Sequence, residues 1–182
     1  MIARRFQDCR VELLDPSRSD DFFRLVDANR DRLEDFFSGT VARCKTLKDT
    51  RDYCELVERR IKERLYFPYM VCDRSTGEYL GLVDIKSIEW SVPKAEIGYF
   101  IDQKCSGRGI ISEALGHVIE MVVAEFGFRK LLCRVNSGNL ASIRVAVKNG
   151  FELEGTIRND YVTTSGKPVD LDYYGRVFQT IS

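Results

Sequence analysis

The sequence has few of the residues that metal centres require and no charge excess of the kind that nucleic-acid-binding surfaces carry. It holds one histidine, and its six cysteines are scattered without a Cys-x-x-Cys pair, so we expect no metal site. Lysine and arginine total 28, and so do aspartate and glutamate. With no excess of charge of either sign, we expect neither nucleic acid nor a membrane surface as a partner.

Long apolar segments are also missing. No apolar run approaches the roughly 20 residues that a membrane helix needs. Residues 1–10 contain Arg4, Arg5 and Arg10 without a hydrophobic segment behind them, which is unlike a secretion signal. Unpaired cysteines are typical of a reducing compartment. We therefore expect a cytoplasmic protein, and its 182 residues suit one domain with one core, spanning 1–182.

The hydrophobic pattern predicts helices first and a mainly antiparallel sheet later. The predicted helices span 17–29, 30–37, 46–65, 110–126 and 139–149, and the predicted strands span 10–14, 66–72, 79–85, 95–101, 131–135, 151–157 and 171–178. The strand at 95–101, the helix at 110–126 and the strand at 131–135 have the order of a β–α–β crossover. We therefore expect an α+β domain with at least one crossover in its sheet.

A glycine-containing turn lies between the strand at 95–101 and the helix at 110–126. It reads Lys104-Cys105-Ser106-Gly107-Arg108-Gly109-Ile110. The first N–H groups of a helix are unpaired, and the positive end of the helix dipole lies behind them. Glycine has no side chain to keep an anion away from that backbone. The turn therefore predicts a site for a phosphate or pyrophosphate.

Together with its neighbours, this turn resembles the acetyl-CoA motif of the GNAT superfamily of N-acetyltransferases. The family motif reads Arg/Gln-x-x-Gly-x-Gly/Ala, and residues 104–109 match it except that Lys104 stands first. The segments that are similar to the branch with the Rim-type ribosomal-protein N-terminal acetyltransferases are Arg30-Asp31-Arg32-Leu33, Ala95-Glu96-Ile97-Gly98-Tyr99, Ser112-Glu113-Ala114-Leu115, Asn136-x-x-Asn139-x-x-Ser142 and Asn149-Gly150-Phe151-x-Leu153-Glu154-Gly155. The resemblance runs from residue 10 to the end.

The resemblance implies the GNAT fold, a mixed and mainly antiparallel sheet with helices on both faces, and acetyl-CoA as co-substrate. It also implies that the strand at 95–101 splays from its neighbour, pairs its freed backbone with the pantetheine arm and stabilises the oxyanion with one N–H. The cofactor-binding residues that it implies are Phe100, Ile101, Lys104, Cys105, Ser106, Gly107, Arg108, Gly109, Ile110, Asn136, Asn139 and Ser142. Lys104 and Arg108 have a plain alternative as solvated bases, and Asn139 also suits a helix N-cap.

The chemistry implied is direct attack of a neutral amine on the thioester. An α-amino group, with a pKa of roughly 8, needs less help from a base than a lysine at roughly 10.4. The candidate bases are Asp160 and Glu96, each with a surface ion pair as the alternative. A tyrosine acid is common in the family, but Ala146 occupies its place. Ser142 is the substitute, either as proton donor or as a hydrogen-bond partner of CoA.

Three other interpretations concern single residues. Cys105 lies at a helix N-terminus, where a thiolate nucleophile is stabilised, but it lacks a histidine partner, so we disfavour that role. His117 is in line with Glu113 and Glu120, which predicts a solvated, ion-paired side chain. Core packing is the commoner role for several aromatic residues that an acceptor groove also suits, namely Phe36, Phe37, Tyr66, Phe67 and Trp90.

The acceptor stays open at this stage. The leading hypothesis is a protein N-terminal α-amine, such as that of a ribosomal protein. The alternatives are a small-molecule amine (a polyamine, an amino acid or an antibiotic) and a non-catalytic acyl-CoA-binding sensor. A homodimer is possible through the closing strands and the turn at 163–168.

Overall fold

The computed structural model describes residues 4–179, which form one eight-stranded sheet in the order β1-β2-β3-β4-β5-β6-β8-β7. All neighbouring strands are antiparallel except β5 and β6. The strands are β1 (Arg4–Phe6), β2 (Cys9–Leu13), β3 (Phe67–Asp73), β4 (Tyr79–Glu89), β5 (Lys94–Ile101), β6 (Lys130–Asn136), β7 (Glu152–Val162) and β8 (Pro168–Val177). The parallel pair is joined through a helix, which confirms the predicted crossover.

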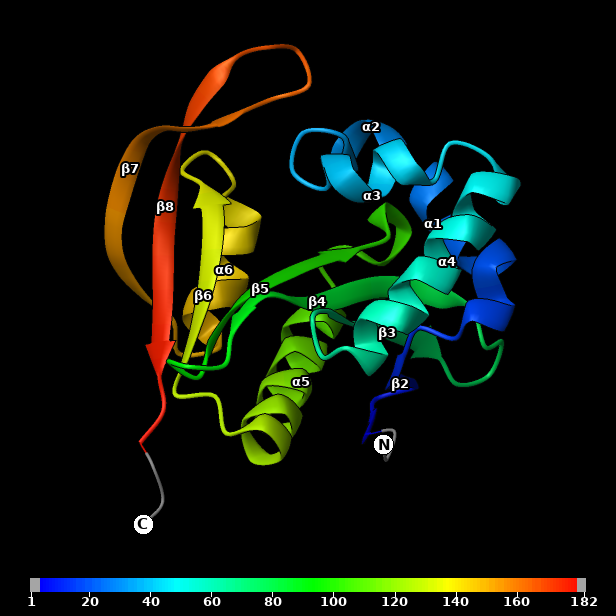
Figure 1. Cartoon of the computed structure of the whole chain (residues 1–182), viewed down its shortest axis with the longest axis horizontal. Helices are drawn as coiled ribbons and strands as arrows, with labels where there is room; N and C mark the ends of the chain where they lie inside the picture. The colour runs from blue at the N-terminus through cyan, green and yellow to red at the C-terminus, as the bar shows by residue number, and fades with distance from the viewer. Residues whose placement is uncertain (1–3, 180–182) are drawn as a thin grey trace.

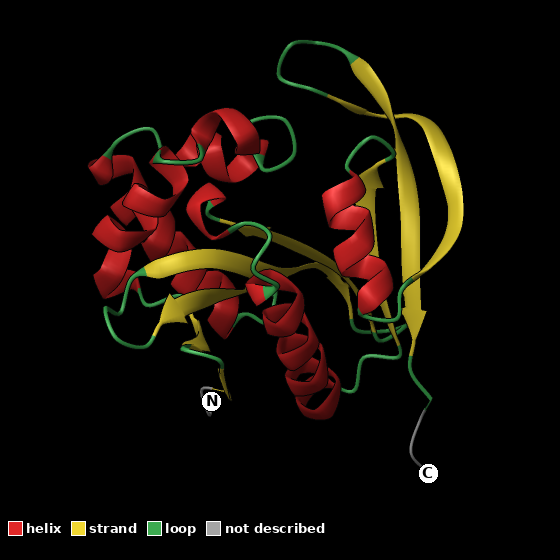
Figure 2. Cartoon of the chain, turned by 180° about the vertical axis from the view of Figure 1, so that it is seen from behind, coloured by secondary structure: helices red, strands yellow, loops and turns green. Residues whose placement is uncertain are grey.

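Helices cover both faces of the sheet, as expected (Figures 1 and 2). The helices are α1 (Ser19–Asp27), α2 (Arg30–Leu33), α3 (Ser38–Arg43), α4 (Leu47–Lys62), α5 (Ile110–Phe126) and α6 (Leu140–Lys148). Because side chains alternate along a strand, β4 contributes Val83 and Ile85 to the core beneath α5 and Leu82 to the core beneath α1 and α4. Within residues 4–179, no helix is both long enough and apolar enough to span a membrane.

The N-terminal helices differ from the prediction. The helix expected at 30–37 ends at Leu33, and a further helix, α3, begins at Ser38 and contains Gly39. Burial of Thr40 and Val41 accounts for this extra turn of helix. The helix expected at 17–29 begins two residues later, at Ser19. A short 3-10 turn at Pro16–Arg18 precedes it, and the Asp15 side chain accepts a hydrogen bond from the Ser17 N–H of that turn at 2.9 Å.

The hydrogen bonding between β5 and β6 stops after three residue pairs. The paired residues are Lys94 with Lys130, Ala95 with Leu131 and Glu96 with Leu132. Beyond them, β5 continues beside β4 as far as Ile101, whereas β6 continues beside β8 as far as Asn136. The two strands therefore diverge (Figure 1), as the resemblance implied, and open the sheet at its centre.

Helices α5 and α6 flank this opening on one face and are tied together by Asn149. Its side-chain amide donates to the backbone oxygens of Ser112 at 3.0 Å and Val145 at 2.9 Å. It also lies 3.2 Å from the Ser112 hydroxyl. These bonds fix the relative position of two helices that are separated by β6.

We expect Asn149→Ala to lower the free energy of unfolding by about 1–3 kcal/mol, because it removes the side-chain hydrogen bonds that join Ser112 of α5 to α6. The exposed Glu152→Ala is the matched control and should stay close to wild type. Urea denaturation followed by circular dichroism measures both. Equal stability of the two variants would contradict the proposed tie between α5 and α6.

Candidate active site

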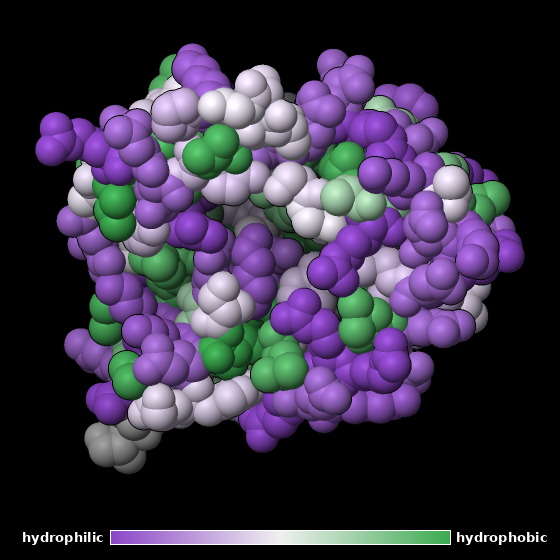
Figure 3. Space-filling view, turned by 45° about the horizontal axis from the view of Figure 1, so that its top comes forward, coloured by the Kyte–Doolittle hydropathy of each residue, from purple (hydrophilic) through white to green (hydrophobic). Residues whose placement is uncertain are grey.

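A cavity of about 490 Å³ passes through the opening between β5 and β6. In Figure 3 the molecular surface is hollowed near its centre, and both polar and apolar side chains border the hollow. Along β5, Ile97 and Tyr99 face the helices α5 and α6, whereas Phe100 faces the core beneath α1 and α4. The cavity therefore has a first end beside α5 and α6 and a second end beside α2 and α3.

The glycine turn borders the first end. Gly107 and Gly109 have φ angles of +77° and +78°, in the left-handed region that favours glycine. A Cβ atom added to either would meet no heavy atom within 4 Å, so the turn is open. Gly109 immediately precedes α5, whose first N–H groups lack intrahelical partners. This is the backbone shape expected for an anion site, and anion binding itself stays a prediction.

The structure brings most of the predicted cofactor residues to the cavity. The predicted residues that line it are Glu96, Phe100, Ile101, Ser106, Gly107, Gly109, Asn136, Asn139 and Ser142. Those outside the lining are Lys104, Cys105, Arg108, Ile110 and Asp160. Lys104 and Arg108 are exposed, whereas the side chains of Cys105 and Ile110 are buried in the core beneath α5. Burial of the Cys105 thiol agrees with the preference against a nucleophile there.

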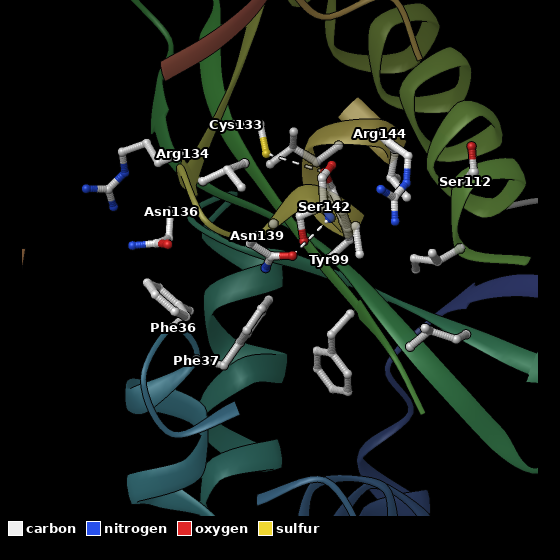
Figure 4. Close-up of a pocket in the computed structure, with 18 of the residues that line it drawn as sticks. Phe36, Phe37, Tyr99, Ser112, Cys133, Arg134, Asn136, Asn139, Ser142 and Arg144 are labelled. Carbon is white, nitrogen blue, oxygen red and sulfur yellow. Dashed lines mark hydrogen bonds between the residues drawn. The ribbon is translucent and has the colours of Figure 1, made fainter. Parts of the chain in front are cut away.

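The beginning of α6 presents polar groups to the cavity (Figure 4). The Asn139 side chain accepts from the Ser142 N–H at 3.1 Å, which confirms the N-cap. From β5, the Tyr99 hydroxyl donates to the Ser142 carbonyl at 2.7 Å. Burial raises the pKa of Tyr99, so the phenol keeps its proton and remains a donor. The sequence did not predict the hydrogen bond from Tyr99 to Ser142, because no local pattern links the two residues.

Five cationic side chains on the cavity wall were also missed. They are Arg32 of α2, Lys86 of β4, Arg134 of β6, and Arg144 and Lys148 of α6. The spacing of four between Arg144 and Lys148 puts both on one face of a helix, and the sequence alone shows that spacing. Arg32 donates to the Asn29 side chain at 3.0 Å and lies 3.4 Å from the carbonyl oxygen of Ile101, so its guanidinium is beside the end of β5.

Both candidate bases lie beside one arginine on β6. Arg134 is 3.1 Å from the Glu96 carboxylate and 3.6 Å from that of Asp160. Asp160 also accepts from the Tyr173 hydroxyl at 2.8 Å. Burial lowers the pKa of Arg134, but Glu96 outweighs that effect and raises it, so the guanidinium stays charged. Of the two carboxylates, Glu96 lines the cavity.

Aromatic residues frame the second end. The rings of Phe36 and Phe37 lie below Asn136 and Asn139 in Figure 4. Phe36 stacks on Tyr161 of β7 with ring centroids 5.7 Å apart, and Ser38 is 2.9 Å from the Tyr161 hydroxyl. Of the other candidate groove aromatics, Tyr66 and Phe67 are buried. Trp90 stacks on Phe128 with ring centroids 5.5 Å apart, so these three serve packing.

His117, which was predicted to be solvated and ion-paired, is half-buried. Its ring centroid lies 5.2 Å from that of Phe6, and its Nδ1 atom is buried without a hydrogen-bond partner among the described residues. The cause is β1, which the sequence did not reveal and which covers this side of α5. Across residues 4–179, no cluster of three or more His, Cys, Asp or Glu side chains that could hold a metal ion is found.

A family model described as the acetyltransferase (GNAT) domain matches residues 10–152. The ribosomal-protein-serine acetyltransferase of Escherichia coli K12 is 31% identical over 103 residues, which span 57% of this chain and 57% of that relative. The solved ribosomal-protein-S5-alanine acetyltransferase of Vibrio fischeri superposes with a TM-score of 0.88 at 18% identity, covering 97% of each chain.

RimL, a ribosomal L7/L12 α-N-protein acetyltransferase solved in complex with CoA, superposes with a TM-score of 0.86 at 22% identity. That match covers 95% of this chain and 96% of RimL. At these identities the two structural matches establish the fold, and the family model establishes the family to which the chain belongs. With residues 10–152 matched and the sheet opened at its central parallel pair, the chain belongs to the GNAT family of N-acetyltransferases.

Proposed function

We propose that this enzyme uses acetyl-CoA to acetylate a protein N-terminal α-amine, such as that of a ribosomal protein. The observation that carries the proposal is the cavity through the sheet, with an open helix N-terminus at one end and a carboxylate framed by aromatic rings at the other. The CoA complex of RimL supports acetyl-CoA as the donor, and the name of the E. coli relative supports the acceptor class.

The donor would occupy the first end. Backbone N–H groups of residues 105–110 would hold its pyrophosphate, with Arg144 and Lys148 nearby to balance charge. Beyond Glu96, the edge of β5 that faces the opening has no strand pairing in the described residues. Unpaired backbone groups favour an extended amide-containing partner, which describes the pantetheine arm. Acetyl-CoA supplies an activated thioester carbonyl, and an N–H of β5 would stabilise its oxygen.

The acceptor amine would enter at the second end. Glu96 would take the proton that the amine loses, directly or through one water, while the amine nitrogen bonds to the acetyl carbon. As the carbon–sulfur bond breaks, Ser142 would donate a hydrogen bond that stabilises the departing thiolate, and the thiolate would take its proton from water. Asp160 would orient Arg134, because it lies outside the cavity and contacts that guanidinium. An α-amine suits this weak base better than a lysine does.

The proposal extends to compartment and assembly. All six cysteines are buried and unpaired, which suits the reducing cytoplasm. The edge strand β7 exposes Leu153, Ile157 and Val162, and an exposed apolar edge suits pairing with a second copy of the chain. A cytoplasmic homodimer is the arrangement that these two features favour.

We expect Gly107→Glu to abolish CoA binding, because it places a side chain and a negative charge where the pyrophosphate would lie. Gly166→Glu is the matched control. Gly166 has a φ angle of +79° and equally open surroundings, but it lies in the turn between β7 and β8. Thermal shift and calorimetry with CoA measure both variants. Unchanged affinity in Gly107→Glu would refute the assignment of the turn.

We expect Glu96→Gln to lower kcat about 100-fold at neutral pH, since the amide cannot accept the proton. The matched control, Glu154→Gln, removes a carboxylate that pairs with Lys130 at 2.7 Å on the surface. It should retain wild-type turnover. Release of free CoA thiol with a peptide bearing an N-terminal serine is the assay. If Asp160→Asn loses more turnover than Glu96→Gln, the roles of the two carboxylates are reversed.

The acceptor class is tested with a panel of amines at saturating acetyl-CoA. Peptides with a free N-terminal serine or alanine should turn over fastest, and their N-acetylated forms should be inert. Faster turnover of polyamines or free amino acids would assign a small-molecule acceptor instead. CoA-induced stabilisation without thiol release from any amine would assign a non-catalytic sensor.

A further inference from the structure

Five charged side chains of alternating sign form a row across the second end of the cavity. Lys86 of β4 lies 3.6 Å from Asp84 on its own strand and 3.6 Å from Glu96 on β5. Arg134 continues the row from Glu96 to Asp160. Three carboxylates and two cations leave one negative charge in excess, so the row attracts one further cation.

Lys86 is held between two carboxylates without a close bond to either. Both of its 3.6 Å separations exceed the distance of about 2.7–3.2 Å that a direct N–H···O bond has. The strand register accounts for this position, because Lys86 lies opposite Glu96. Its ammonium also lies 5.3 Å from the centre of the Phe37 ring, on the cavity wall.

Asp84 has an unused acceptor. It is only 3% exposed, and one of its oxygens accepts from the Tyr66 hydroxyl at 3.1 Å. Its other oxygen, Oδ1, is buried and has no hydrogen-bond partner among the described residues. A buried carboxylate oxygen without a donor is unfavourable, so a closer approach by Lys86 would stabilise it.

Gly98 makes room for this pair. It lies opposite Asp84 in the register and lines the cavity. A Cβ atom at Gly98 would come within 2.5 Å of Asp84 Oδ1 and 2.9 Å of the Lys86 nitrogen. The absence of a side chain there leaves the space between Asp84 and Lys86 open, so the ammonium has a path from one carboxylate to the other.

Lys86 remains a cation in this setting. Burial lowers its pKa, but the carboxylates of Asp84 and Glu96 outweigh that effect and raise the pKa above its usual value. The side chain therefore acts as a charge that changes partner, and it is unsuited to be a base or a nucleophile.

We propose that Lys86 is a movable counter-ion, which neutralises Glu96 while the second end is empty and shifts to Asp84 when an acceptor ammonium reaches Glu96. This inference rests on the proposed function, since it takes Glu96 as the carboxylate that receives the acceptor amine. The ammonium neutralises the excess charge of the row, and Glu96 is then free to take the proton. Lys86 and Asp84 are positioning residues, because both act through Glu96.

The test is a double-mutant cycle on the KM for a peptide with an N-terminal serine, at saturating acetyl-CoA. Asp84→Asn removes the charge to which Lys86 retreats, so KM should rise about fivefold, the change that corresponds to roughly 1 kcal/mol. Lys86→Met removes the competitor for Glu96, so KM should fall. In the Lys86→Met background, Asp84→Asn should leave KM unchanged, because its effect operates through Lys86. An equal rise in both backgrounds would show a merely structural role and overturn the proposal.

Two further variants keep the test decisive. Tyr66→Phe removes the hydroxyl that donates to Asp84, so Asp84 should hold Lys86 more tightly and KM should fall. This variant tests the proposal independently of whether Asp84→Asn folds. A rise in KM for Tyr66→Phe would contradict the proposal. Lys94→Met is the matched control, since Lys94 pairs with Glu89 at 3.0 Å away from the row. Its KM should equal that of wild type, and a shift like that of Lys86→Met would overturn the proposal.

Failure of the inference and failure of the proposed function give different results. If wild type acetylates no amine, the proposed function is refuted. The double-mutant cycle can then be measured with the calorimetric affinity of the same peptide for the CoA-bound protein in place of KM. If wild type acetylates the peptide but the cycle shows no coupling between Asp84 and Lys86, the inference alone is refuted.

Discussion

The cavity exists because β5 and β6 stay hydrogen-bonded over only three residue pairs. Each strand keeps its outer partner, β4 or β8, so the sheet stays continuous on both sides while it opens in the middle. Buried backbone N–H and C=O groups almost always have partners. An opening of this kind is therefore maintained by the surrounding layers, in particular by α5 and α6 and the Asn149 side chain that joins them.

The opening separates two chemical environments. On one side the backbone of the glycine turn and the first turns of α5 and α6 provide N–H groups and positive ends of helix dipoles. On the other side Glu96, Arg134 and the aromatic rings of Phe36 and Phe37 provide a partly charged, partly apolar wall. A negatively charged donor and a positively charged acceptor suit opposite sides of one sheet, and the opening between β5 and β6 joins the two sides.

The features that follow from local patterns could be predicted from the sequence. Apolar runs bounded by turns located β3 to β5, and the two glycines of the turn located the start of α5. The Asn139 cap was readable from its position before α6. The features that depend on register or on distant segments could not be predicted. Lys86 meets Glu96 only because of how β4 pairs with β5. His117 is covered only because β1, a strand of three residues, packs on α5.

The second end of the cavity is framed by two segments that lie far apart in the chain. The connection between α2 and α3 reaches β7 through the stacking of Phe36 on Tyr161. It reaches the turn beyond β7 through Asp35, which accepts from the Thr164 hydroxyl at 2.8 Å. Neither segment contributes to the glycine turn. Substitutions or changes of length in these loops can therefore reshape the entrance for one substrate during evolution while the binding surface for the other stays intact. One scaffold can in this way diversify its acceptors without redesigning its donor site.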